Sequence, residues 1–94
     1  MSYIAKTAKV LGNAIVCDNA MVKGNAWITD NATVCDNAQV YGNARVWGYA
    51  RVWRYAQVYD FALVDDMAVI GGHAKVYGSA MVEGNAILEG DVTI

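Results

Sequence analysis

The sequence contains no proline, one histidine, one phenylalanine and two cysteines. It has no run of 18 apolar residues, so we expect no membrane-spanning helix and no membrane partner. Its first six residues lack the apolar stretch and cleavage site of a secretory signal peptide. We therefore expect a cytoplasmic protein, and the 94 residues are enough for one small domain, residues 1–94.

The scarcity of cysteine and histidine limits the chemistry that the chain offers. Cys17 and Cys35 are too few to form a disulfide framework. A zinc site would need two further ligands of the usual kind, and His73 is the one histidine of the chain. We therefore expect no metal.

Charged residues are distributed unevenly, although the net charge is only −2. Residues 1–54 hold six Lys or Arg and three Asp, whereas residues 55–94 hold one Lys and six Asp or Glu. A general nucleic-acid-binding protein would carry a broad basic face, so we do not expect that function. The gradient does favour head-to-tail electrostatic attraction between copies.

An internal repeat of six residues covers nearly the whole chain. A small residue opens each unit, namely Ala8, Ala14, Ala20, Ala26, Ala32, Ala38, Ala44, Ala50, Ala56, Ala62, Ala68, Ala74, Ala80, Ala86 and Val92. Two residues later comes a branched aliphatic, from Val10 to Ile94, with no slot skipped. Alternation of apolar and variable residues predicts a short strand with Ala and Val facing inward. The Gly-Asn or Asp-Asn pairs that usually close the units outside residues 44–61 predict corners, because these residues tolerate positive φ.

This repeat resembles the hexapeptide-repeat family, whose units coil into a left-handed parallel β-helix of triangular cross-section. The resemblance spans about residues 2–94 and implies an all-β solenoid of about five coils of 18 residues. Residues 18 apart then stack at ~4.8 Å, the spacing of adjacent strands. Cys17 and Cys35 are stacked in this way, and ~4.8 Å exceeds the ~3.8 Å preferred between disulfide Cβ atoms, so we expect both to be reduced.

Stacking sorts the outward residues into three faces, two of which are too apolar to face water throughout. One stripe comprises Leu11, Trp27, Trp47, Leu63 and Met81, and the other comprises Ile15, Trp53, Val69 and Ile87. Exposed apolar patches of this extent mark interfaces, although outward aromatic residues also simply favour strands. We expect the first stripe to form a homo-oligomer interface. Members of the family with parallel prisms are often trimers, and the unpaired strand edges at the ends also allow an end-to-end dimer.

The corners in the middle of the chain depart from the repeat. Tyr49, Tyr55, Phe61, Met67 and His73 occupy five consecutive slots that otherwise hold Asn, and we expect such bulky residues to be strained by positive φ. Together with nearby arginines they predict a binding surface at residues 45–61, which we call the girdle. Its members are Arg45, Trp47, Tyr49, Arg51, Trp53, Arg54, Tyr55, Tyr59 and Phe61.

The girdle suits two kinds of partner. Flat apolar rings beside guanidinium groups are typical of protein hot spots, and equally of sites for a small anionic ligand such as a nucleotide. A third interpretation is that the bulky girdle residues only cover neighbouring corners and so stabilise the fold. On the third face, Tyr41, Tyr59 and Tyr77 predict a stacked ladder beside Gln39 and Gln57, which we interpret as scaffold.

The resemblance also implies an alternative, because many hexapeptide-repeat proteins are acyltransferases that use coenzyme A or carrier-protein thioesters. They place a histidine as general base between neighbouring prisms, and His73 is the candidate here, flanked by glycines that could admit a substrate. The chain lacks the protruding loop and C-terminal extension that complete those sites. We therefore favour a non-catalytic oligomeric binding module without a cofactor, and keep an acyl-CoA-dependent enzyme as the alternative.

Overall fold

The computed structural model describes residues 2–94, and their strands begin at every sixth residue. Sheet A contains β1 (Tyr3–Ile4), β4 (Met21–Val22), β7 (Gln39–Val40), β10 (Gln57–Val58) and β13 (Lys75–Val76). Sheet B contains β2 (Lys9–Val10), β5 (Trp27–Ile28), β8 (Arg45–Val46), β11 (Leu63–Val64) and β14 (Met81–Val82). Sheet C contains β3 (Ile15–Val16), β6 (Thr33–Val34), β9 (Arg51–Val52), β12 (Val69–Ile70) and β15 (Ile87–Leu88).

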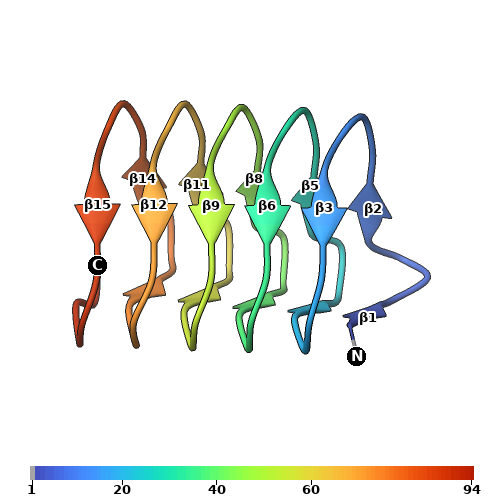
Figure 1. Cartoon of the computed structure of the whole chain (residues 1–94), viewed down its shortest axis with the longest axis horizontal. Coiled ribbons are helices and arrows are strands. Elements are labelled where there is room, and N and C mark those ends of the chain that lie inside the picture. The colour runs from blue at the N-terminus through green and yellow to red at the C-terminus, as the bar shows by residue number, and fades with distance from the viewer. Residues whose placement is uncertain (1) are drawn as a thin grey trace.

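All strand pairs are parallel, and each residue pairs with the residue 18 positions further along, as Gln39 does with Gln57 and Gln57 with Lys75. The chain rises along sheet B at the back of Figure 1, crosses the top, descends along sheet C at the front and returns along sheet A as it advances. This path is a left-handed coil. The expected all-β solenoid of about five 18-residue coils is confirmed.

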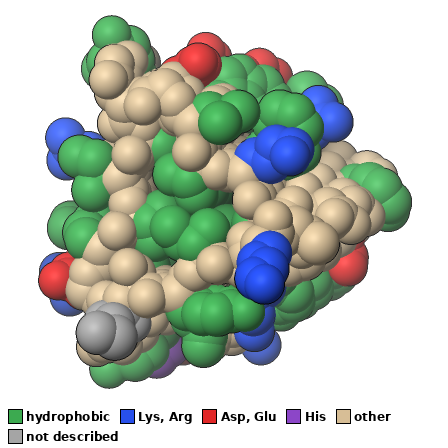
Figure 2. Space-filling view, turned by 90° about the vertical axis from the view of Figure 1, so that its right-hand side faces the viewer, with side chains coloured by type: hydrophobic (Ala, Val, Ile, Leu, Met, Phe, Trp, Pro, Cys, Tyr) green, Lys and Arg blue, Asp and Glu red, His purple; other side chains and the backbone are tan. Residues whose placement is uncertain are grey.

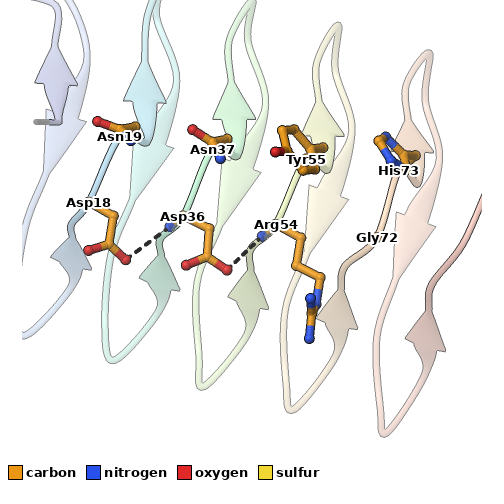
Figure 3. Close-up of a pocket in the computed structure, with 8 residues that line it drawn as sticks. All are labelled: Asp18, Asn19, Asp36, Asn37, Arg54, Tyr55, Gly72 and His73. Atoms are coloured by element: carbon orange, nitrogen blue, oxygen red, sulfur yellow. Dashed lines mark hydrogen bonds between the residues drawn. The ribbon is translucent and has the colours of Figure 1, made fainter.

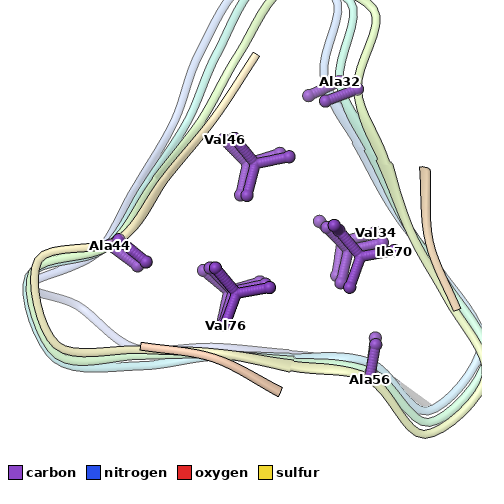
Figure 4. Packing of buried hydrophobic residues seen from close by; sticks show 14 of the residues in the cluster. Ala32, Val34, Ala44, Val46, Ala56, Ile70 and Val76 are labelled. Atoms are coloured by element: carbon purple, nitrogen blue, oxygen red, sulfur yellow. The ribbon is translucent and has the colours of Figure 1, made fainter. Parts of the chain in front are cut away.

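The core is a column of alanine and branched aliphatic side chains inside a triangular prism (Figure 4). Every inward Ala and Val or Ile from Ala20 to Val76 is fully buried, and no buried polar side chain occurs among the described residues. Small and medium side chains fill this narrow interior, where a larger residue would overpack. Burying each Val or Ile contributes about 1.5–3 kcal/mol, so the repeat itself supplies the stability of the fold.

The two ends of the prism are open. Inward residues of the first and last coils are only partly buried, and Ile4 and Ile94 are both 44% exposed. Figure 2 looks onto the end formed by β1, β2 and β3, where hydrophobic side chains gather at the centre with Lys and Arg side chains around them. Among the described residues, no helix has the length and apolar character needed to cross a bilayer.

Each corner from Gly12 to Gly90 is a tight turn whose first residue has a positive φ. At the corner after β8, for example, the N–H of Ala50 donates to the carbonyl of Trp47 at 3.3 Å, and Gly48 has φ 69°. Glycine or Asp holds this position at every other corner from Gly12 to Gly90, and the corner after β9, where Arg54 has φ 56°, is the exception. The expectation that Tyr49 and the other bulky corner residues carry positive φ is therefore wrong by one position. The residue directly before each of them adopts the positive φ.

Candidate functional site

The structure distributes the girdle around the whole prism. Tyr49 lies on the edge between sheets B and C, Tyr55 on the edge between C and A, and Phe61 on the edge between A and B. Arg45 and Trp47 belong to the face of sheet B, Arg51 and Trp53 to that of sheet C, and Tyr59 to that of sheet A. One ligand cannot contact all of these side chains, so the site must be sought on one face and its neighbouring edges.

The edge between sheets C and A carries a ladder of backbone-to-carboxylate hydrogen bonds (Figure 3). The N–H of Asp36 donates to Oδ2 of Asp18 at 3.3 Å, and the N–H of Arg54 donates to Oδ2 of Asp36 at 3.2 Å. Asp30, Asp60 and Asp66 accept the N–H of the residue 18 positions later in the same way. Asp therefore suits the turn position because it tolerates positive φ and also binds the next coil.

The same edge becomes aromatic in the third and fourth coils. The rings of Tyr55 and His73 are stacked with centroids 5.0 Å apart and planes 8° apart. They line a groove of about 660 Å³ with the carboxylates of Asp18 and Asp36, and with Arg54. Figure 3 shows the rings of Tyr55 and His73 in line with the side chains of Asn19 and Asn37. The groove is thus acidic at one end and aromatic at the other.

On sheet C, Trp53 and Arg54 are packed against each other and against glycine. The guanidinium carbon of Arg54 lies 5.2 Å from the centroid of the Trp53 ring. A Cβ built on Gly71 would come within 2.5 Å of Trp53 Nε1, so the glycine makes the space that the indole fills. Nε1 is buried, and in the described part of the chain it has no hydrogen-bond partner. An unpaired buried donor of this kind costs about 1–3 kcal/mol.

Two shallow grooves flank Arg51, which is exposed at the centre of sheet C. One, of about 220 Å³, is lined by Thr33, Cys35, Arg51, Val52 and Trp53. The other, of about 320 Å³, is lined by Asn31, Thr33, Tyr49, Arg51, Met67 and Val69. Thr33 and Arg51 border both grooves, so together the grooves form a band across the sheet.

The glycines beside His73 have structural roles. Gly71 accommodates the Trp53 indole, and Gly72 has φ 59° at a turn where a Cβ would come within 2.4 Å of Gly90 N. The expectation that they admit a substrate to His73 is therefore corrected: each glycine makes space for another part of this chain.

Sheet B carries the apolar stripe that the sequence predicted. Leu11, Trp27 and Met81 are 49%, 37% and 61% exposed, whereas Trp47 and Leu63 are half-buried. Arg45 lies over Trp27 with its guanidinium carbon 5.5 Å from the ring centroid, a second Arg–Trp pair in the protein. Within the stripe, Leu63 and Met81 are paired in neighbouring strands, whereas Trp27 is paired with Lys9 and with Arg45.

The tyrosine ladder on sheet A is confirmed. The rings of Tyr41 and Tyr59 stack with centroids 4.9 Å apart, and those of Tyr59 and Tyr77 with centroids 5.4 Å apart. Burial raises the pKa of the Tyr41 phenol, and Tyr59 and Asp60 raise it further. The ladder covers the sheet with stacked rings, as expected for a scaffold.

The expectation of reduced cysteines is wrong. Cys17 and Cys35 form a disulfide, and their Cα atoms are 4.7 Å apart. Disulfides span Cα separations of about 4.4–6.8 Å, so the strand spacing is compatible with a bond. The strand spacing is a distance between backbones, and the side chains of stacked residues can lean toward each other, so their Cβ and sulfur atoms can lie closer than the strands do.

One acidic cluster was not predicted from the sequence. Oxygen atoms of Asp65, Asp66 and Glu83 lie within 4.8 Å of one another. Burial raises the pKa of the Asp65 carboxyl, and the charges of Asp66 and Glu83 raise it further. The 18-residue separation of Asp65 and Glu83 was the signal that could have revealed the cluster. Exposed carboxylates gather in this way without an ion, and the cluster by itself defines no site.

The parallel coils and the exposed girdle define a β-solenoid repeat protein. Among known families, the one described as YdcK beta solenoid repeat matches residues 38–54, nearly one coil. These residues include β7, β8 and β9 and end at Arg54. Neither the curated proteins nor the solved structures gave a match.

Proposed function

We propose that this chain is a non-catalytic binding module that assembles with copies of itself and binds a protein partner through the girdle. The observation that carries the proposal is the exposure of Tyr49, Tyr55, Phe61 and Met67, each between 56% and 64%. These side chains replace Asn at consecutive corners and add little to the core. Large apolar groups left in water in this way are typical of surfaces that become buried on binding.

The strain at Arg54 supports the same proposal. A non-glycine residue in the left-handed region costs about 1–2 kcal/mol, and Asp at this position would also supply a hydrogen bond to the next coil. The chain instead has an arginine there, stacked on Trp53. Strain that the fold does not require is a recognised mark of functional positions.

Binding through the girdle is tested by changing both Trp53 and Arg54 to alanine. The matched control changes Lys23 and Tyr41, a cation–aromatic pair on sheet A outside the girdle, in the same way. Proteins retained by the immobilised chain from a lysate of its source cells are identified by mass spectrometry, and the affinity of each is then measured by calorimetry. We expect the first variant to lose the partner, the control to keep it, and both to keep a β-rich circular dichroism spectrum. Full affinity in the first variant would make the girdle structural.

Self-assembly is proposed to use the stripe of sheet B. Light scattering of the 10.1 kDa chain at micromolar concentration should give more than one subunit. Changing Leu63 and Met81 to glutamate should yield monomers if the prisms pack side by side, as in the trimers of the hexapeptide-repeat family. Ile87→Glu on sheet C, where the side chain is 65% exposed, is the control. An oligomer that survives the double change would instead involve the ends, and a monomeric wild-type chain would overturn self-assembly.

An acyltransferase-like enzyme of the hexapeptide-repeat family remains the second candidate. Its supporting observation is that His73 lines the groove at the edge between sheets C and A. The assay is release of free coenzyme A from acetyl-CoA in the presence of small amines and alcohols. His73→Asn is the suitable variant, because Asn occupies this corner slot in more of the other units than any other residue does. Turnover that disappears in this variant would favour the enzyme over the binding module.

The cytoplasmic location stays a proposal, and the disulfide provides a test of it. Structural disulfides persist in oxidising compartments and are rare in the cytosol. Cells are lysed into an alkylating agent, and the free thiols of Cys17 and Cys35 are counted by mass spectrometry. Two alkylated cysteines would agree with a cytoplasmic protein, whereas an intact disulfide would point to an oxidising compartment.

A further inference from the structure

The part of the girdle on sheet C is suited to one chemical class of partner. Arg51 is exposed there, and its guanidinium group makes no hydrogen bond or ion pair with any described residue. No acidic residue occurs between Asp36 and Asp60, a stretch that contains the arginines of β8, β9 and the following corner. A cationic side chain between two grooves, in a segment without internal carboxylates, is available for an external anion.

The side chains around Arg51 can complete such a site. Thr33 lies directly beneath Arg51 in the paired strand β6, and its hydroxyl borders the same two grooves. Arg54 lies at the end of the band, over the ring of Trp53. A guanidinium group binds a carboxylate through two parallel hydrogen bonds, and a hydroxyl can donate a third.

The rings of Tyr55 and Trp53 argue against a nucleotide base stacked at the Arg54 end of the band. A base would need the open face of a ring. One face of Tyr55 is covered by the stacked His73, and Trp53 packs against Gly71 and beneath Arg54. The edge groove beyond them contains the carboxylates of Asp18 and Asp36, which repel an anion. The favourable course for an anionic ligand is therefore across sheet C, along the band through Arg51.

Apolar surface continues along the same sheet. Val69 borders one groove, and Ile87 in the next coil is 65% exposed. Tyr49 and Met67 project from the neighbouring edge, where they are 63% and 61% exposed. A partner that reaches Arg51 thus meets Tyr49 at the neighbouring edge and aliphatic side chains in the coils on the C-terminal side of the arginine. A polypeptide with both acidic and apolar side chains matches this arrangement better than a free inorganic anion.

We propose that sheet C binds an acidic protein segment, with an Asp or Glu carboxylate held by Arg51 and Thr33 and a second carboxylate by Arg54. This inference rests on the proposed binding function and names the chemistry of its partner. Binding draws the Arg54 guanidinium toward the ligand, so the electrostatic environment of the Trp53 indole changes. The three tryptophan N–H signals in an NMR spectrum can therefore report binding without any assay of activity.

The test is an NMR titration of the ¹⁵N-labelled chain with a six-residue glutamate peptide carrying one leucine at each end. The same peptide with glutamine in place of glutamate is the matched probe, and inorganic phosphate and ATP are the small-anion probes. We expect the glutamate peptide to shift the indole signal of Trp53, assigned with Trp53→Phe, and to leave that of Trp27 in place. Arg51→Gln should weaken binding at least tenfold, whereas Lys9→Gln, at an exposed position on sheet B outside the girdle, should leave it unchanged.

Three outcomes would overturn the inference. The glutamate peptide fails to bind, or it binds Arg51→Gln as tightly as the wild-type chain, or phosphate or ATP binds more tightly and displaces it. The peptide results can fail in the first two ways while a cellular partner still depends on Trp53 and Arg54. In that case the proposed binding function stands, and only the proposal that the partner is an acidic segment is wrong. Conversely, Arg51-dependent peptide binding with a cellular partner that ignores Trp53 and Arg54 would uphold the Arg51 site and remove the proposed dependence of that partner on Trp53 and Arg54.

Discussion

The backbone N–H of Arg54 donates to the carboxylate of Asp36, one coil earlier, at 3.2 Å. Asp36 itself donates to Asp18 in the same way, so the ladder continues to Arg54 and ends there, because arginine has no acceptor for the coil above. Arg54 also departs from the Gly or Asp found at the other corners between Gly12 and Gly90. Arg54 thus adopts an unfavourable backbone conformation and also lacks the side-chain hydrogen bond to the next coil. It is therefore the most informative position to change.

Arg54→Asp should increase the free energy of unfolding by about 1 kcal/mol, measured by urea denaturation. Asp tolerates the left-handed conformation better than Arg and can accept the N–H of Gly72, and these gains exceed the lost contact with Trp53. Arg51→Asp makes the same change of charge in a strand and should bring no gain. A variant less stable than the wild type would show that Arg54 serves the fold.

Gly71→Ala should destabilise the protein by about 1–3 kcal/mol, because the new methyl group would overlap the indole of Trp53. The displaced ring should also shift the tryptophan fluorescence to longer wavelength. In a Trp53→Ala background the same change should be nearly neutral, since the space is then empty. Equal losses in both backgrounds would mean that Gly71 is needed for another reason.

Reduction of the Cys17–Cys35 disulfide should lower the free energy of unfolding by about 3 kcal/mol, the value for a loop of this length. The effect should be local, because each coil of a solenoid contacts only its neighbours. Hydrogen exchange is expected to accelerate in residues 3–16 and to stay unchanged in residues 45–76. Uniform acceleration would show that the coils unfold as one unit. The double serine variant serves as the permanently reduced control.

Tyr59→Leu should destabilise more than Tyr41→Leu or Tyr77→Leu. Tyr59 stacks on both of the other rings, whereas each of them loses a single stacking partner in the ladder. At about 0.5–1.5 kcal/mol per aromatic pair, the difference is large enough for urea denaturation to resolve. Equal losses at the three positions would assign the effect to burial of each side chain and not to ring stacking.

Asp65→Asn should stabilise the protein slightly at neutral pH. The pKa of the Asp65 carboxyl is raised in the folded state, so the folded chain holds its proton more tightly than the unfolded chain does. Its contribution therefore falls as the pH rises from the unfolded pKa of 3.8 through the raised folded value. We expect a gain of at most about 0.5 kcal/mol at pH 7, vanishing at pH 3. A gain that persists at pH 3 would exclude the titration of Asp65 as its cause.

Much of the fold could be predicted from the sequence because the solenoid is built from local rules. The six-residue period specifies which side chains face inward, where each corner falls and which residues are 18 apart. The tyrosine ladder follows directly from that register, and the apolar stripe of sheet B follows from which side chains face outward. Corner conformation was misplaced by one residue, because Gly-Asn and Asp-Asn contain two residues that tolerate positive φ and the sequence does not say which one adopts it.

The sequence by itself therefore determined the coil, its inward column of Ala and Val, and the ladders along its faces, since each depends only on spacing along the chain. Only the tertiary structure decided what lies across faces and edges. It separated the girdle onto three edges, joined Cys17 to Cys35, covered Gly71 with the Trp53 indole and left Arg51 between two grooves. These features depend on the direction in which side chains lean. Contacts with neighbouring side chains determine that direction, and the periodicity of the sequence alone does not predict it.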